Sequence, residues 1–191
     1  MPSQLAPFND GQFIKCMTWL LKHQGGPVTQ FDMVKLHVLA DFYHVIACGR
    51  PIIGGNLEKW PLGPVVKRAY DRARYWAYLS DEGKPGSPFD IRLADGRAYE
   101  YSAPLDSNVD ERSMSQSEKD ALLRAWKVLM VDCPDFNDRH AYFHDPARSF
   151  VARAYDKSRE HLDWADLIAE YDQEFGEDHA DVLAAIVQRN E

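Results

Sequence analysis

Apolar residues recur at intervals of three and four positions along most of the chain, which is the spacing of an amphipathic helix. The first such stretch follows Asn9 or Asp10, either of which can cap a helix, and it stops before Gly25. We therefore predict a first helix between these positions. Its apolar positions are Phe13, Met17, Leu20 and Leu21.

A second helix is predicted from about Gln30 to Cys48. Thr29 and Asp32 have the spacing of a capping box at its start. Gly49 suits a helix C-cap, and the following proline prevents continuation. Apolar residues cover more than one face of this stretch, so we expect a central helix that is largely buried.

The next segments alternate between turns and regular structure. Residues 52–63 contain three glycines and one proline, so we expect an irregular or short extended connection. Pro64 suits the first turn of a third helix, from Val65 to about Leu79. Residues 89–102 alternate around Asp95 and Gly96, the residues preferred in a two-residue turn, and this pattern predicts a β-hairpin.

The C-terminal half is predicted to be helical. Ser115 and Glu118 form a capping box for a helix that runs through Val131. Further helices are expected from about 145, over 164–175 and over 179–188. The pattern as a whole predicts a mainly α fold, a compact helical domain of about six to seven helices with one β-hairpin near residues 89–102.

The net charge of −8 is concentrated at the C-terminus. Residues 156–191 contain eleven acidic and three basic residues, which leaves residues 1–155 neutral. We therefore divide the chain into a helical domain with a hairpin insertion, 1–155, and an acidic helical extension packed on the same domain, 156–191. A neutral body with an acidic end lacks the basic footprint of a nucleic-acid-binding protein, so nucleic acid is an unexpected partner.

The cysteines and the N-terminus bear on the compartment. Cys16, Cys48 and Cys133 are odd in number and widely spaced, which fits neither a disulfide framework nor a CxxC metal site. The first ten residues lack the features of a signal peptide, and no apolar run is long enough for a membrane span. We expect a cytoplasmic protein that does not contact membrane.

One helical face contains side chains that could bind a metal, namely His37, Asp41, His44 and Cys48. These residues extend over about 16 Å of helix, so a single ion could reach only two of them. The alternative is a buried histidine that hydrogen-bonds to polar neighbours. We expect neither a metal nor another cofactor, and a metal-dependent enzyme is the least favoured interpretation.

Catalytic motifs are not apparent. The sequence contains no nucleophile elbow, zincin motif, Walker loop or dinucleotide-binding glycine pattern. His140 and His144 lie beside aromatic residues, and we expect them to have structural roles. We therefore predict that the protein is not an enzyme and name no catalytic residue.

The predicted third helix is basic, with Lys59 just before it. Such residues usually form a solvated face. They could also contact an acidic partner, because arginine is enriched at interface hot spots, or receive the acidic C-terminal segment of the same chain. The basic residues of this helix are Lys67, Arg68, Arg72 and Arg74.

A set of polar and turn-forming residues between positions 35 and 70 resembles the Panacea domain of SocA-like antitoxins, a prophage-associated family. The set comprises Lys35-Leu36, His44, Gly49-Arg50-Pro51-Ile52, Glu58-Lys59-Trp60, Gly63-Pro64-Val65-Val66 and Tyr70. Most of these residues have a structural explanation: Gly49 and Pro51 end a helix, Gly63 and Pro64 make a turn, and Trp60 is a large anchor. Lys35, His44 and Glu58 could tie the segments together.

The resemblance implies an antitoxin that neutralises a co-encoded protein toxin by direct contact. Some SocA-like proteins instead act as adaptors that deliver the toxin to a AAA+ protease, and a phage-encoded regulator of a host target is a further alternative. From the motif and the charge placement, we expect the partner to contact the basic third helix and the loop from Glu58 to Leu62. The residues of this partner-binding hypothesis are Glu58, Trp60, Lys67, Arg68 and Arg72.

Overall fold

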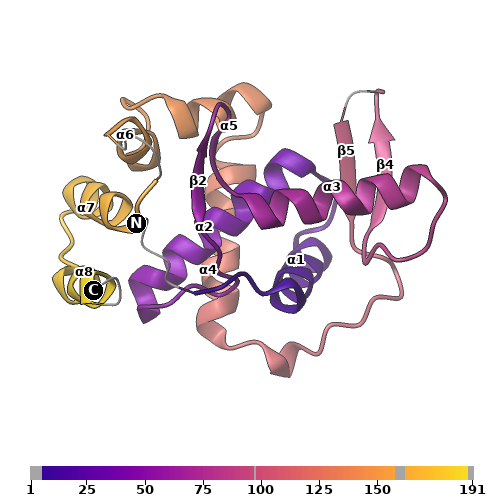
Figure 1. Ribbon diagram of the computed structural model, residues 1–191, viewed down its shortest axis with the longest axis horizontal. Helices are drawn as coiled ribbons and strands as arrows, with labels where there is room; N and C mark the ends of the chain where they lie inside the picture. Colours follow the sequence, from indigo (N-terminus) through magenta and orange to yellow (C-terminus); the bar gives the residue numbers. More distant parts are fainter. Residues whose placement is uncertain (1–5, 97, 158–161, 189–191) are drawn as a thin grey trace.

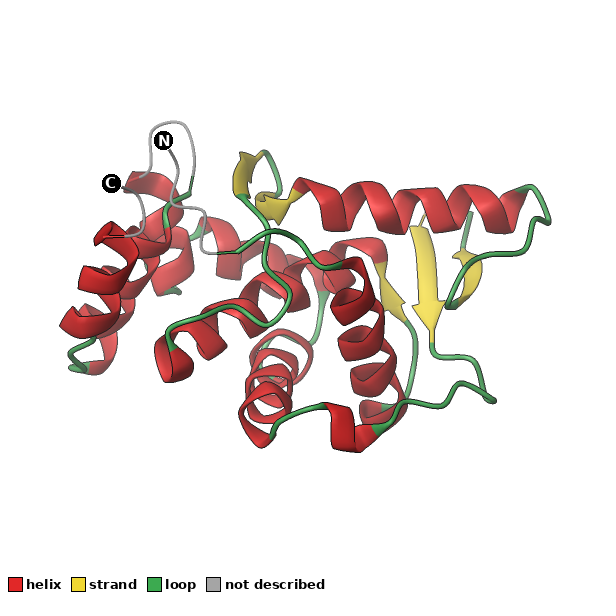
Figure 2. Ribbon diagram, turned by 60° about the horizontal axis from the view of Figure 1, so that its bottom comes forward, coloured by secondary structure: helices red, strands yellow, loops and turns green. Residues whose placement is uncertain are grey.

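The computed structural model describes residues 6–96, 98–157 and 162–188 of the chain, and α-helices dominate them (Figures 1 and 2). Eight α-helices and two small antiparallel sheets are present in this part of the chain, which confirms the predicted mainly α class. The helices are α1 (Asp10–Gln24), α2 (Gln30–Cys48), α3 (Lys67–Asp81), α4 (Gln116–Trp126), α5 (Phe136–His144), α6 (Phe150–Lys157), α7 (Trp164–Phe175) and α8 (Ala180–Gln188). The strands are β1 (Val28–Thr29), β2 (Leu57–Trp60), β3 (Gly63–Val66), β4 (Asp90–Ala94) and β5 (Ala98–Ser102).

Helix α2 is the centre of the molecule. Every residue from Asp32 to Val45 is buried, including charged ones, because other helices and both sheets pack around it. The Thr29 side chain accepts from the Asp32 amide, and the Asp32 carboxylate accepts from the Thr29 amide, so the predicted capping box is present. Gly49 ends the helix in the left-handed conformation at φ 68°.

The predicted hairpin at 89–102 is also present. β4 and β5 pair antiparallel, and Asp95 and Gly96 both have positive φ. Ala94 pairs with Ala98, so the connection is one residue longer than the predicted two-residue turn. β1 adds to β5 and gives a three-stranded sheet in the order β1-β5-β4. The buried Tyr101 hydroxyl donates to the Ala73 carbonyl of α3 over 2.9 Å, which fixes the sheet against that helix.

Strand β1, a second hairpin and one helix were missed by the sequence pattern. The connection after α2 contains a second hairpin, β2–β3, in which Trp60 pairs with Gly63 across the turn residues Pro61 and Leu62. Pro64 therefore lies in a strand, and α3 begins at Lys67 instead of Val65. Helix α5 was also missed; it begins where the Asp135 side chain accepts from the Asp138 amide.

The C-terminal helices gather at the end of the molecule opposite β4 and β5 (Figure 1). α7 packs on α6 and α2, and the buried Glu170 carboxylate accepts from Arg153 over 3.0 Å and from Lys157. Glu170 and Glu174 of the acidic segment therefore pair with α6, and Asp172 and Glu177 pair with His179 of the same segment. α6 itself spans the position at which the acidic segment begins.

None of the helices in the described ranges combines the length and the hydropathy that a membrane crossing would need.

Candidate partner-binding groove

A groove of about 780 Å³ lies between the start of α2, the β2–β3 turn, one face of α3 and the start of α5. Its surface is mainly apolar, and two of its rim residues, Leu62 and Phe136, each expose 49% of their surface. Exposed apolar side chains around a hollow are typical of a surface that another molecule covers. The other apolar and aromatic lining residues include Phe31, Val34, Trp60, Val65, Tyr70 and Tyr99.

Lys35 of α2 also lines the groove, although only 1% of its surface is exposed. Its ammonium group donates to the Pro64 carbonyl over 2.6 Å and faces the rings of Phe31 and Phe143, at 5.3 and 4.8 Å from their centres. Within the described residues it has no carboxylate partner. Burial therefore lowers the pKa of Lys35 well below its ordinary value, because the charged form loses its hydration.

Gly63 makes room for this arrangement. Its φ is +90°, and a Cβ atom at this position would lie 2.8 Å from Cβ of Phe143 and 3.1 Å from Nζ of Lys35. The glycine is therefore required by both its backbone conformation and the close approach of α5. Gly63, part of the Gly-Pro motif, thus allows β3 to lie close to the buried ammonium group of Lys35.

The far wall of the groove is tied to α2. Arg139 of α5 pairs with Asp32 of α2 over 2.8 Å, and both side chains are largely buried. Phe31 packs against Phe136 with 5.3 Å between the ring centres. These contacts hold α5 in place and leave the Phe136 ring at the rim.

Trp60 forms the near wall. Its ring packs edge-on against Tyr70 of α3 at 4.9 Å, and its Nε1–H donates to the Glu58 carboxylate over 2.8 Å. Its carbonyl accepts from the Tyr155 hydroxyl of α6. Glu58 thus orients Trp60 locally and does not pair with Lys35.

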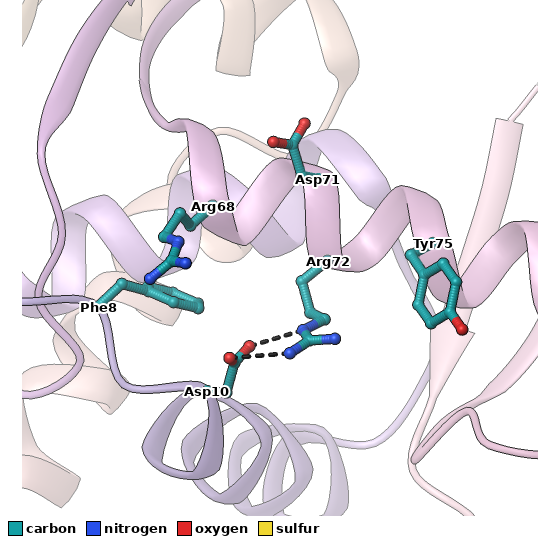
Figure 3. Close-up of a pocket in the computed structure, with 6 residues that line it drawn as sticks. All are labelled: Phe8, Asp10, Arg68, Asp71, Arg72 and Tyr75. Carbon is teal, nitrogen blue, oxygen red and sulfur yellow. Dashed lines mark hydrogen bonds and ion pairs between the residues drawn. The ribbon is translucent and has the colours of Figure 1, made fainter.

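A smaller hollow lies on the opposite side of α3, between that helix and the N-terminal segment (Figure 3). The Arg72 guanidinium donates to both carboxylate oxygens of Asp10, over 2.6 and 2.8 Å, while Arg68 lies beside Phe8. This bidentate pair lowers the pKa of Asp10. The hollow has a volume of about 200 Å³.

The structure consequently divides the residues of the partner-binding hypothesis. Trp60 lines the large groove, with Glu58 behind it, whereas Arg68 and Arg72 line the small hollow across α3. Lys67 pairs with the exposed Asp71 on the helix surface. Arg74 lines the large groove instead, because it lies on the Tyr70 face of the helix.

The polar residues on one face of α2 hold the following loop by hydrogen bonds. The Asp41 carboxylate accepts from the amides of Ile52, Ile53 and Gly54 over 2.7–2.8 Å, and its Oδ2 lies 3.0 Å from Nε2 of His37. All of these contacts are buried. They supply hydrogen bonds to a loop that has no regular partners of its own.

His44 ties the next part of the same loop. Its Nδ1 lies 2.7 Å from the Arg50 carbonyl, and its Nε2 lies 3.2 Å from the Ser117 hydroxyl of α4. Cys48 is exposed at the end of the helix. Within the described ranges no three His, Cys, Asp or Glu side chains come together as a metal site would require.

The remaining candidate residues for chemistry are Cys16, His140 and His144. Cys16 is buried, and burial raises the pKa of its thiol, which disfavours the nucleophilic thiolate. His140 and His144 stack on α5 with their ring centres 4.5 Å apart. Burial and the neighbouring His140 lower the pKa of His144.

A family model described as "Antitoxin SocA-like, Panacea domain" matches residues 33–130. The chain belongs to this family. No curated protein and no solved structure matches the chain significantly. Membership supports an antitoxin role in general and a function other than catalysis, and an antitoxin implies a toxin as partner.

The Panacea match contains most of the groove. Lys35, Trp60, Val65 and Tyr70 lie within it, while Phe31 precedes it and Phe136 follows it. Sequence reasoning included Leu62, at the end of the suspected loop, but missed Phe136 as a rim residue. The usable signal for Phe136 was an apolar residue directly after a helix-capping residue, Asp135.

Proposed function

We propose that this Panacea protein neutralises a co-encoded protein toxin by direct binding, and that the groove beside Trp60 is the contact surface. The observation that supports this best is the convergence of family-segment residues on one apolar hollow. Lys35, Trp60 and Tyr70 are separated by up to 35 positions in the chain and line the same groove.

The groove suits a protein partner better than the small hollow across α3 does. Buried aromatic and apolar residues dominate the energetics of protein interfaces, whereas exposed ion pairs contribute little. The groove offers the first kind of contact. In the small hollow the Arg72 guanidinium is already occupied by Asp10, whose side chain comes from the same protein.

The experiment is co-expression with each adjacent small open reading frame, followed by measurement of growth and by co-purification. We expect one neighbour to inhibit growth alone, and we expect this chain to restore growth and to co-purify with it. If no neighbour is toxic, or if a toxic one is neither rescued nor bound, the proposal is wrong.

Matched variants locate the surface. Leu62→Glu places a charge at the groove rim, and Leu105→Glu places the same charge on the loop after β5, where Leu105 is fully exposed. We expect Leu62→Glu to abolish rescue and Leu105→Glu to retain it. Arg68→Glu with Arg72→Glu tests the other side of α3; loss of rescue in that variant alone would move the contact surface there.

The level of the toxin separates two modes of neutralisation. A toxin that accumulates in complex with this chain is neutralised by binding. A toxin whose steady-state level falls on rescue, and recovers when AAA+ proteases are deleted, is delivered for degradation, and the protein is then an adaptor.

A further inference from the structure

The charged side chains that line the groove are of one sign. Its lining includes two cationic side chains, Lys35 and Arg74, and no carboxylate. The protein as a whole carries a net charge of −8, so a cationic, apolar hollow is a local departure from the rest of the molecule. Such a site is complementary to an apolar group that bears a negative charge.

Lys35 is the residue that defines this charge. A buried ammonium group is unfavourable unless it is paired, and buried lysines ordinarily have a carboxylate or a network of acceptors as partner. The described residues provide one carbonyl acceptor, that of Pro64, and two aromatic faces. An ammonium group has three donors, so this site can accept further oxygen ligands.

The position of Lys35 is held from several sides. Gly63 lies directly against its Nζ, and Phe143 closes the space beneath. The lysine therefore cannot easily withdraw, and its direction is fixed before any partner arrives. Fixed charge of this kind favours binding because little reorganisation is needed.

We propose that the groove receives a segment of the partner protein that has an aromatic or branched aliphatic side chain next to a carboxylate. The apolar side chain packs among Phe31, Trp60 and Phe136, and the carboxylate pairs with Lys35. Arg74, at the edge of the groove, attracts the acidic segment. This inference rests on the proposed function, because the toxin is the protein that supplies the segment.

The dimensions of the site fit such a segment. The volume of about 780 Å³ lies within the range of roughly 300–1,000 Å³ that encloses ligands of a few side chains. An Asp or Glu of the partner would exchange hydration for a charge-assisted hydrogen bond in an apolar setting. A partner without an acid would leave the ammonium group buried and without a counter-ion.

The test uses the full-length protein and a random heptapeptide library displayed with free N-termini. We expect the selected peptides to be enriched in Asp or Glu next to Phe, Trp, Leu or Ile. Replacing the selected acid by its amide, Asp by Asn, should weaken binding by at least about tenfold, as measured by fluorescence anisotropy of labelled peptides.

Two variants provide the control. In Lys35→Met the preference for Asp over Asn should disappear, while Arg68→Gln, on the opposite side of α3, should keep it. If Lys35→Met does not fold, the comparison of Asp and Asn peptides on the unmodified protein decides alone. Equal binding of the two peptides, or selection of peptides without acids, overturns the inference.

Two further results complete the test. Displacement of the selected peptide by octathymidine at about 0.15 M salt would assign the groove to single-stranded nucleic acid and overturn the inference. Toxin rescue without any acid preference would refute this inference and leave the antitoxin proposal standing. Acid-dependent peptide binding without any toxic neighbour would support the acid preference of the groove and refute the antitoxin proposal.

Discussion

Asp41 and Gly54 are joined by a 2.7 Å hydrogen bond from the glycine amide to the carboxylate, although they are 13 residues apart in the chain. The same carboxylate accepts from Ile52 and Ile53, so one side chain replaces the partners that a strand would have given this loop. The N-terminal segment then lies on the loop, through hydrogen bonds from Asn9 to Ile53 and from Gly55 to Ala6. Asp41 therefore supports two layers of irregular backbone.

We predict that Asp41→Ala is strongly destabilising. It leaves three buried amides without their acceptor and leaves His37 Nε2 with the Gly54 carbonyl alone, so we expect the free energy of unfolding to fall by at least about 3 kcal/mol. Urea unfolding followed by circular dichroism measures this change. Asp120→Asn, at an exposed carboxylate on α4, is the matched control and should change stability by less than about 0.5 kcal/mol. Similar losses of unfolding free energy in the two variants would contradict the role of Asp41 in holding this loop.

A second prediction compares two glycines with positive φ. Gly63→Ala combines backbone strain with contacts to Phe143 and Lys35 at 2.8 and 3.1 Å, whereas Gly83→Ala has the strain alone, because no atom lies within 4 Å. We expect Gly83→Ala to lower the free energy of unfolding by about 1 kcal/mol and Gly63→Ala by about 2 kcal/mol or more. Thermal and urea unfolding of the two variants give the difference, and equal values would mean that Gly63 matters only for its backbone.

The third prediction concerns pH and Lys35. Burial lowers the pKa of its ammonium group in the folded state, so the unfolded chain binds the proton more tightly. The stability contributed by this residue is therefore greatest above the ordinary pKa of 10.5 and is lost as the pH falls through the lower folded pKa. We expect the wild-type protein to gain stability relative to Lys35→Met between about pH 7 and about pH 10. Urea unfolding at both pH values tests this, and parallel stability curves would show that Lys35 is not desolvated.

The same substitution separates stability from binding. At neutral pH we expect Lys35→Met to be no less stable than the wild-type protein, because an apolar side chain of similar length replaces a buried charge. A residue that lowers the stability of the free protein and is needed for partner binding behaves as expected of a binding residue. Loss of both properties together would indicate a purely structural lysine.

A fourth prediction concerns Glu170. Burial opposes its ionisation, but hydrogen bonds from Lys157 and Arg153 outweigh this effect and lower its pKa below 4.5. Its contribution to stability is therefore complete above that value and is lost as the pH falls through the folded pKa. We expect Glu170→Gln to be less stable than wild type at about pH 7 and the difference to shrink as the pH falls below 4.5 through the folded pKa. Unfolding curves across that range check it; a constant difference would contradict the assigned pairs.

Local chemistry made much of the fold predictable. The capping boxes at Thr29 and Ser115 and the Asp95-Gly96 turn are satisfied within a few residues, and the structure contains all three. The hairpin β2–β3 and helix α5 depend on distant partners. In the sequence Pro64 suits the start of a helix, but in the structure it lies in β3 and its carbonyl accepts from the distant Lys35. The apolar residues of α5 are too few to show a helical period.

The site was predictable only in part for the same reason. The motif drew attention to Trp60 and Lys35. The sequence does not tell which face of α3 lies beside them in the groove. Arg68 and Arg74 look equivalent in the sequence, but the helix places them over different hollows. Leu62 belongs to the loop that the motif indicated, whereas Phe136 is an ordinary apolar residue in the sequence and is recognised as a rim residue only from its exposure.

The groove is built from two parts of the chain with different relations to the family. Its floor and near wall fall within residues 33–130, whereas Phe136 comes from α5, after the matched segment ends. A substitution at Phe136 therefore reshapes the opening and leaves every residue of the family segment unchanged. The opening of the groove can therefore diverge through the start of α5 while Lys35 and Gly63, which lie in the matched segment, stay unchanged.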